Sequence, residues 1–158
     1  MPSLKQLLTL RECKDGKPSM KVYKDSVGVL TVGIGHKVLP TDKLKLNDEV
    51  DEARVDAFFT KDTAKAVNAA NAQATKAGIK DAQFKVYLAS VNFQLGSGWN
   101  KIQKKAWQFI LDGDYASAAQ EVGKSKWNAQ TPIRVKDFQK ALLALPEKKA
   151  KGGGAKPP

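Results

Sequence analysis

The pattern of apolar and polar positions predicts a short α+β segment at the start of the chain. Leucines recur at helical spacing after Ser3, a residue type that favours helix N-caps, and this predicts a helix over residues 3–12. Residues 20–36 alternate between apolar and polar side chains on both sides of a turn at 25–28, which is typical of a β-hairpin. Residues 37–50 are polar and have no period, so we expect irregular structure there.

The rest of the chain has the period of helices. An apolar stripe over residues 52–73, which Asp51 is placed to cap, predicts a long helix. Helix-breaking glycine, aspartate and proline positions separate the further helices expected at 81–94, 100–111, 114–122 and 132–144.

These elements predict an α+β fold with two lobes in a single domain, residues 1–145. A small hairpin-containing N-terminal lobe (1–51) is joined by the long helix (52–73) to a larger helical C-terminal lobe (74–145). Residues 146–158 contain no large apolar side chain, and we expect them to form a disordered tail.

Composition excludes several classes of protein. The apolar runs are much shorter than the roughly 20 residues of a membrane-spanning helix. Lys5 and Arg11 interrupt the N-terminal apolar stretch, so we expect no signal peptide. With one cysteine, Cys13, and one histidine, His36, the chain has neither an internal disulfide nor the usual Cys/His zinc site. We expect no metal, no organic cofactor and a monomeric protein.

The charge of the chain points to a polyanionic partner. The formal net charge is +11, of which residues 1–70 carry +2 and residues 71–158 carry +9. Nucleic acid, anionic cell wall and an anionic membrane surface all satisfy this asymmetry. Charge alone does not choose among them.

Two carboxylates and a hydroxyl near the predicted hairpin are candidates for catalysis. Glu12 ends the first helix, Asp25 lies at the turn and Thr31 lies on the returning strand. Glycoside hydrolysis needs one carboxylic acid to protonate the leaving oxygen and a second carboxylate as nucleophile or base. An Asp and a Thr together can hold a water by two hydrogen bonds. On these residues alone, surface or capping carboxylates are the more common interpretation.

A resemblance to a known family changes that interpretation. Residues 21–36, KVYKDSVGVLTVGIGH, resemble the active-site hairpin of the T-even phage lysozymes, glycoside hydrolase family 24. Residues 92–96, NFQLG, resemble a segment that lines the cleft in that family. Residues 124–134, KSKWNAQTPIR, resemble its KSRW-x-x-QTP-x-R segment. The three segments occur in the family's order, and the similarity covers most of residues 3–145.

The resemblance implies a role for each matching residue. Glu12 is similar to the general acid of the family, and Asp25 and Thr31 to the pair that positions the attacking water. An inverting reaction is implied, with carboxyl groups roughly 6.5–9.5 Å apart. Arg134 resembles the arginine that pairs with the catalytic glutamate, and we expect it mainly to orient Glu12. The substrate-binding residues implied by the resemblance are Phe93, Gln94 and Gly35.

The resemblance also implies a structural role for the one histidine. His36 is expected to pair with Asp62 and so to tie the hairpin to the long helix, and we do not expect it to be catalytic. We expect the three tryptophans, Trp99, Trp107 and Trp127, to be packing residues.

The chain departs from the family at several positions. Four extra residues around 14–17 separate Glu12 from the hairpin, and Cys13 replaces the glycine usual after the catalytic glutamate. The stretch between His36 and the long helix is shorter by about a dozen residues. Ala106 and Glu121 stand where the family has a serine and an asparagine that touch substrate. We therefore expect the same chemistry with different subsite contacts.

The leading functional prediction is an endolysin that hydrolyses the β-1,4 bond between N-acetylmuramic acid and N-acetylglucosamine. A lytic transglycosylase is an alternative, but it needs no positioned water and leaves Asp25 and Thr31 without a role. A virion-associated lysozyme module is another alternative. A basic helical nucleic-acid-binding protein would explain the charge and not the hairpin, and no aromatic residues interleave a basic stripe. We therefore expect no nucleic-acid partner.

The predicted partner is bacterial peptidoglycan, with the basic half held near an anionic cell-envelope surface. Because no export signal is visible, we expect synthesis in the host cytoplasm. The enzyme would reach the wall in the periplasm after a separate pore-forming protein, a holin, permeabilises the membrane.

Overall fold

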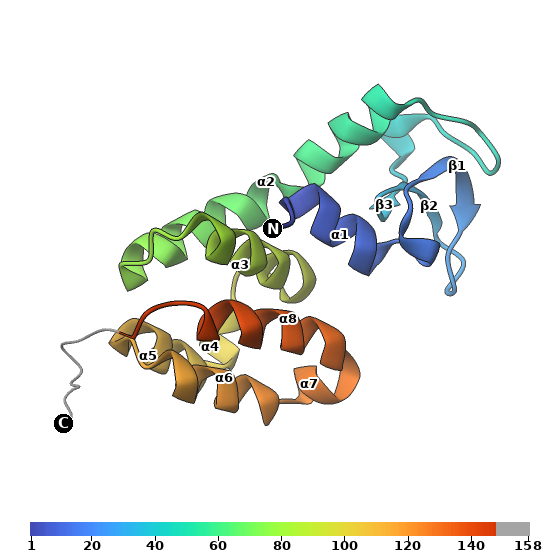
Figure 1. Ribbon diagram of the computed structural model, residues 1–158. Coiled ribbons are helices and arrows are strands. Elements are labelled where there is room, and N and C mark those ends of the chain that lie inside the picture. Colours follow the sequence, from blue (N-terminus) through green and yellow to red (C-terminus); the bar gives the residue numbers. More distant parts are fainter. Residues whose placement is uncertain (148–158) are drawn as a thin grey trace, which may run out of the picture. The chain divides into compact units, whose positions relative to one another are not determined.

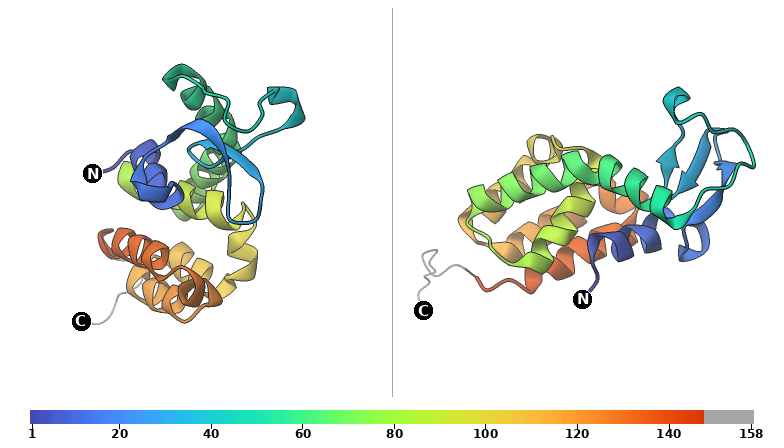
Figure 2. Two further views of the ribbon diagram at one scale, coloured as in Figure 1. Left: turned by 90° about the vertical axis from the view of Figure 1, so that its right-hand side faces the viewer. Right: turned by 90° about the horizontal axis from the view of Figure 1, so that it is seen from above.

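The computed structural model describes residues 1–147 (Figures 1 and 2). It contains two compact units, residues 2–64 and the chain from Lys65 on together with Met1. The first unit holds a small antiparallel sheet between two helices of the chain, and the second is helical. The predicted α+β class is confirmed.

Helix α1 (Leu4–Glu12) begins at a capping box. The Ser3 hydroxyl accepts the N–H of Gln6 at 3.1 Å, and the Gln6 side chain accepts the N–H of Ser3 at 2.9 Å. The helix ends at Glu12. The inserted residues then form one turn of 3₁₀ helix, η1 (Lys14–Gly16), with Asp15 and Gly16 at positive φ. The insertion is therefore a tight turn.

The sheet has the order β1-β2-β3 and is antiparallel throughout. Its strands are β1 (Ser19–Lys24), β2 (Leu30–Gly33) and β3 (His36–Lys37), and the third strand was not predicted. The short helix η2 (Pro40–Asp42) follows in a stretch expected to be irregular. Val22 and Val32 are fully buried and form a core cluster with Phe58 of the following helix. This core fixes which face of the hairpin points outward.

Helix α2 (Glu52–Ala77) extends four residues beyond the predicted end. Asp51 accepts the N–H of Arg54 at 2.8 Å and so caps its start, as predicted. Gly78 ends the helix with a φ of 72°. The boundary between the two units falls within this helix, at residues 64–65.

The second unit continues with six helices among the residues described (Figure 1). Their bounds are α3 (Ala82–Leu95), α4 (Trp99–Ile102), α5 (Lys104–Asp112), α6 (Tyr115–Gly123), α7 (Lys126–Gln130) and α8 (Pro132–Leu143). The single helix predicted over 100–111 is wrong, because Gln103 has a non-helical backbone and separates α4 from α5. Helix α7 was not predicted.

Aromatic rings form the core of the second unit. The ring of Phe138 lies 5.8 Å from that of Phe84, 5.8 Å from Trp99 and 6.0 Å from Trp127, measured between centroids. Trp99 and Trp127 are buried. Both tryptophans are packing residues, as predicted. Trp107 is half-buried and lies edge-on to Trp99 at 5.9 Å.

The described chain extends two residues into the predicted disordered tail. The Glu147 carboxylate accepts the N–H groups of Tyr115 at 3.1 Å and Ala116 at 3.3 Å, in the first turn of α6. A negative charge is favourable at the N-terminus of a helix. The Glu147 carboxylate therefore holds residues 146–147 against the start of α6. The rest of the predicted tail, 148–158, lies outside the described residues.

None of the helices described is both long and apolar enough to span a bilayer.

Candidate active site

Glu12 lies against the end of the hairpin. A Cβ atom built on Gly35 would lie 3.7 Å from both the Cβ and the Oε1 of Glu12. Gly35 has a φ of 69°, a conformation that favours glycine. The Cys13 thiol lies 3.8 Å from the carbonyl oxygen of Gly33. The end of α1 therefore stays beside the hairpin despite the four inserted residues.

Cys13 itself is a packing residue. It is half-buried, and burial, together with the charge of Glu12, raises the pKa of its thiol. A thiol with a raised pKa stays protonated at neutral pH and is a poor nucleophile. Cys13 is therefore not a candidate nucleophile, and Glu12 stays the candidate for chemistry at this end of α1.

Asp25 is held in one orientation by the turn between β1 and β2. Its Oδ1 accepts the N–H groups of Val27 at 2.9 Å and Val29 at 2.8 Å, and its Oδ2 accepts the ammonium of Lys37 at 2.8 Å. The hydrogen bond from Lys37, followed by that from Val29, holds the pKa of this carboxyl below its ordinary value. Asp25 is therefore a carboxylate at neutral pH.

Thr31 lies next to this turn on the central strand. Its side chain is buried, and its hydroxyl donates to the carbonyl oxygen of Val29 at 2.9 Å. Asp25 accepts the N–H of the same residue, Val29. The backbone N–H of Val29 thus orients the side chain of Asp25, and its carbonyl oxygen orients that of Thr31. The sheet register also places Thr31 opposite Tyr23 on β1 and Lys37 on β3, so these three side chains share one face.

In the second unit, the two other motifs meet. The Gln94 side chain accepts the indole N–H of Trp127 at 2.9 Å and donates to the Thr131 hydroxyl at 3.0 Å. Phe93, beside it on α3, is half-buried. Arg134 is buried and donates to the Ser90 hydroxyl at 3.0 Å. Residues 92–96 and 124–134 are therefore parts of one packed region of this unit.

A comparison with known families identifies the family of this chain. Residues 17–142 match the family model of phage lysozymes, a span that includes Asp25, Thr31 and Arg134 and begins after Glu12. The chain belongs to the phage lysozyme family. It is therefore a glycoside hydrolase, an enzyme that lyses peptidoglycan.

Individual relatives support the same family. Probable T4-type lysozyme 2 of Dictyostelium discoideum is 31% identical over 154 residues, which cover 84% of this chain and 88% of that protein. Probable T4-type lysozyme 1 of the same organism is 26% identical, over 76% of this chain and 84% of that protein. Peptidoglycan hydrolase gp36 of Pseudomonas phage phiKMV is 29% identical over 77% of this chain but 13% of that protein.

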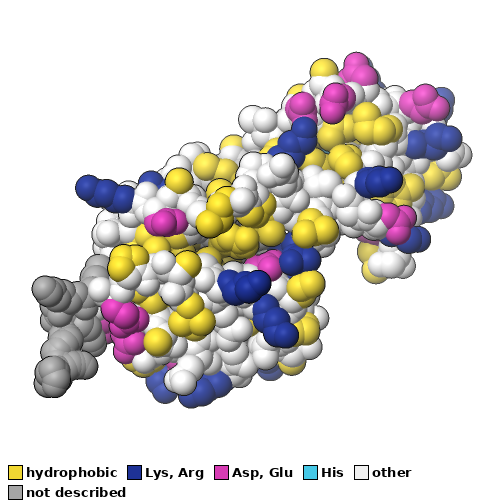
Figure 3. Space-filling model, viewed as in Figure 1, with side chains coloured by type: hydrophobic (Ala, Val, Ile, Leu, Met, Phe, Trp, Pro, Cys, Tyr) yellow, Lys and Arg dark blue, Asp and Glu magenta, His cyan; other side chains and the backbone are white. Residues whose placement is uncertain are grey.

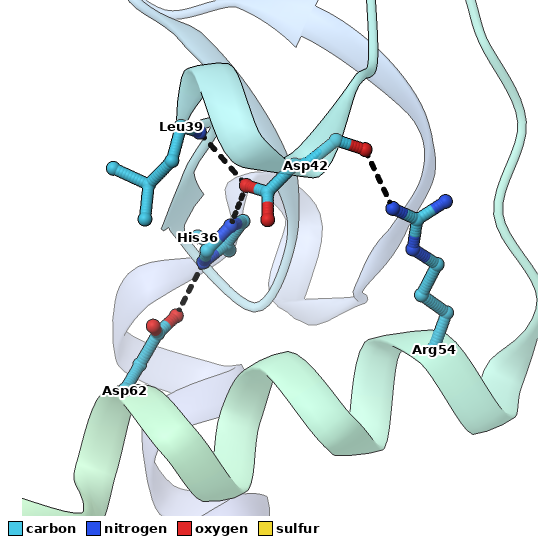
Figure 4. Close-up of polar contacts among 5 residues, drawn as sticks. All are labelled: His36, Leu39, Asp42, Arg54 and Asp62. Atoms are coloured by element: carbon cyan, nitrogen blue, oxygen red, sulfur yellow. Dashed lines mark hydrogen bonds and ion pairs between the residues drawn. The ribbon is translucent and has the colours of Figure 1, made fainter.

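The histidine of this lysozyme lies between two carboxylates (Figure 4). Its Nδ1 is 2.7 Å from an oxygen of Asp62 on α2, and its Nε2 is 2.7 Å from an oxygen of Asp42 on η2. The imidazole stacks on Phe58 with 3.9 Å between ring centroids. Because both ring nitrogens of His36 are engaged, neither is available to transfer a proton to substrate. The Asp62 partner agrees with the resemblance, whereas Asp42 was not predicted.

Asp42 has further partners that hold it in place. Its carboxylate accepts the N–H of Leu39 at 2.7 Å, and its backbone carbonyl accepts the guanidinium of Arg54 at 2.8 Å (Figure 4). Burial acts to raise the pKa of the Asp42 carboxyl. The hydrogen bonds from Leu39 and His36 and the charge of Arg54 outweigh burial, and the pKa lies below its ordinary value.

This pKa gives a prediction for acid stability. A carboxyl whose pKa is lowered by folding stabilises the fold above its unfolded pKa, and that stabilisation is lost as pH falls through the folded value. We expect Asp42→Asn to lower the free energy of unfolding by about 1.5 kcal/mol at pH 7. The difference from wild type should shrink below about pH 4. Thermal unfolding at pH 7 and at pH 3 measures both.

Asp15→Asn, at an exposed aspartate of the inserted turn, is the matched control and should follow wild type at both pH values. A constant gap between Asp42→Asn and wild type from pH 7 to pH 3 would contradict the assignment.

Two of the substitutions that separate this chain from the T-even enzymes lie together. Ala106 and Glu121 line one pocket of about 330 Å³ in the second unit. Lys104, Lys105 and Lys124 line the same pocket, and Lys124 forms an ion pair with Glu121 at 3.2 Å.

Two residues that contact the predicted site residues, Lys37 and Asp42, were not predicted from the sequence. Lys37 is 12 positions from Asp25, and Asp42 is six positions from His36. Neither spacing matches a helix or a single strand pair. The only signal for Lys37 is the sheet register, which becomes known once β3 is recognised.

Proposed function

We propose that this lysozyme hydrolyses the β-1,4 bond between N-acetylmuramic acid and N-acetylglucosamine, with inversion at the anomeric carbon. The observation that carries the proposal is that the Asp25 carboxylate and the Thr31 hydroxyl, both bonded to Val29, have only accepting sites left to offer to a water. A water that donates both its hydrogens in this way has its oxygen lone pair free to attack.

The hydrogen bonds already made by Asp25 and Thr31 support this proposal, because they show which acceptor sites are left for a water. A carboxylate has about four lone-pair sites, and Asp25 uses two on Oδ1 and one on Oδ2. One site remains, on Oδ2. The Thr31 hydroxyl donates its hydrogen to the carbonyl of Val29, so towards any other group its oxygen can only accept a hydrogen bond.

In this proposal Glu12 is the general acid. The water oxygen bonds to C1 of the muramic acid unit while the bond from C1 to O4 of the glucosamine unit breaks. Glu12 gives its proton to that O4, and the water gives a proton to Asp25, so atoms and charges balance. We propose that Phe93 and Gln94 contact the glycan, with the amide of Gln94 kept in one orientation by Trp127 and Thr131.

Product analysis tests the proposed reaction. Purified peptidoglycan is digested with the wild-type protein, and the soluble fragments are analysed by mass spectrometry. Hydrolysis leaves reducing muramic acid ends. Anhydromuramic ends would show a lytic transglycosylase and would leave Asp25 and Thr31 without their proposed role.

Replacement of the Thr31 hydroxyl tests the water site. Thr31→Val keeps the shape of this buried side chain and removes the accepting oxygen. We expect kcat to fall about 100-fold with little change in KM, because the water loses one of its two partners. Thr31→Ser, which keeps the hydroxyl, should stay within about tenfold of wild type. Steady-state kinetics on soluble glycan strands measure both, and equal rates for Thr31→Val and wild type would contradict the water site.

We propose that the enzyme acts as an endolysin, made in the host cytoplasm and admitted to the wall by a holin. The match to the phage lysozyme family supports this role. The relative from phage phiKMV matches over only 13% of its length, which keeps a module of a larger virion protein as the alternative. Expression in bacteria tests the need for a pore: the protein should leave cells intact until chloroform opens the membrane, and then lyse them.

We also propose that the basic half helps to hold the enzyme at an anionic envelope surface. On the face shown in Figure 3, Lys and Arg side chains are interspersed with acidic and apolar ones and form no single patch. The support is therefore the net charge of residues 71–158, +9. Binding to wall fragments that does not weaken between about 0.01 and 0.15 M salt would contradict it.

A further inference from the structure

Lys37 is a charged residue at the candidate site for which the proposed reaction has no chemical role. It lies on β3, and its ammonium is 2.8 Å from Oδ2 of Asp25. The Lys37 side chain is 58% exposed and that of Asp25 is 18% exposed. An ion pair this open to solvent adds little to the stability of a fold. Its presence at a catalytic carboxylate therefore calls for another explanation.

The backbone of Lys37 is firmly held on both sides. His36, before it, is fixed by Asp42 and Asp62, and Val38, after it, donates its N–H to the carbonyl of Leu30 at 2.9 Å. Lys37 is also the register partner of Thr31 on the central strand. The ammonium therefore approaches Asp25 from the same face of the sheet that carries the Thr31 side chain.

We propose that Lys37 is a positioning residue for the reaction, holding Oδ2 of Asp25 so that one acceptor direction remains for the attacking water. The inference rests on the proposed function. Without Lys37, Oδ2 has two free lone pairs and the water has two alternative positions. With Lys37, the water that bridges to Thr31 has a single position.

The same contact favours the ionised form of Asp25. The charged and titratable groups around it are Lys37 on β3, Lys24 next to it in the chain, and Tyr23 on β1. Of these, Lys37 makes the hydrogen bond that contributes most to the lowered pKa of Asp25. A protonated Asp25 could not accept the proton of the attacking water. Loss of Lys37 should therefore move the acid limb of the activity profile to higher pH.

The test compares K37M with K24M and K37R. Lys24 is exposed, adjacent to Asp25 in sequence and outside the proposed machinery, so K24M is the matched control. The readouts are kcat and KM on soluble glycan strands across pH, and the titration of the Asp25 carboxyl carbon followed by NMR. We expect K37M to lower kcat about tenfold, leave KM within about twofold, and raise the pKa of Asp25. K24M should match wild type, and K37R should restore most of kcat.

Several results would overturn the inference. One such result is that K37M has the same Asp25 pKa and the same kcat as wild type. That result would show that Lys37 neither positions the Asp25 carboxylate nor lowers its pKa. A change in KM alone would make Lys37 a substrate contact. If the wild-type protein cleaves no glycan, the proposed function falls and the role of Lys37 falls with it, whereas a wild-type rate in K37M removes the role of Lys37 alone.

Discussion

Glu12→Gln should lower the rate of peptidoglycan cleavage about 1,000-fold while the protein stays folded. Glutamine has the shape of glutamate but cannot supply a proton to the leaving oxygen. The Glu12 side chain lies beside Gly35, and the substitution does not change its size. The loss should therefore appear in kcat and not in the temperature of unfolding.

The measurement is the release of soluble fragments from purified peptidoglycan, with thermal unfolding recorded on the same samples. Glu49→Gln, at an exposed glutamate of the same unit, is the control and should retain full activity. A Glu12→Gln protein that keeps more than about a tenth of the wild-type rate would show that another group protonates the leaving oxygen.

The largest expected effect on stability is that of Phe138→Ala. Phe138 is 1% exposed and its ring contacts three other aromatic rings, so its removal leaves a cavity lined by rigid side chains. We expect the free energy of unfolding to fall by about 4 kcal/mol. For a protein of this size the midpoint of thermal unfolding should fall by about 10 °C.

Leu143→Ala, at a 61% exposed position of the same helix, is the matched control and should cost less than about 0.5 kcal/mol. Denaturant unfolding gives both values. A loss below about 2 kcal/mol for Phe138→Ala would mean that the surrounding rings close the cavity.

Local chemistry explains why much of the fold could be predicted. The capping side chains of Ser3 and Asp51 form the hydrogen bonds expected of them, and Gly78 ends α2. The apolar stripes are buried where the helical period placed them, as at Phe58 and Phe138. These signals depend on residues within one or two turns of each other, so a sequence displays them directly.

Other features depend on residues far apart in the chain. The break at Gln103 has no glycine or proline to mark it, and α7 is a helix of only five residues. Asp42 lies in a polar stretch that looks irregular until η2 turns its carboxylate toward His36. The roles expected for Glu12, Asp25 and Thr31 came from the family resemblance, because the chemistry of carboxylates and hydroxyls does not by itself mark a catalytic residue.

The hydrogen bonds of Val29 could be predicted neither from the pattern of apolar and polar residues nor from the family resemblance. Its N–H orients Asp25 and its carbonyl takes the Thr31 hydrogen, which leaves both side chains as acceptors. Thr31 is also buried, so its hydroxyl has little freedom to turn elsewhere. We propose that these two acceptors orient the attacking water for the inverting reaction.

The anomeric configuration of the first product tests this account most directly. Soluble glycan strands are digested in an NMR tube, and the anomeric protons of the new muramic acid ends are followed before mutarotation mixes the two forms. Attack by the water that Asp25 and Thr31 hold, on the face opposite the leaving group, predicts that the α-anomer appears first. Initial appearance of the β-anomer would show retention and would contradict a direct attack by that water.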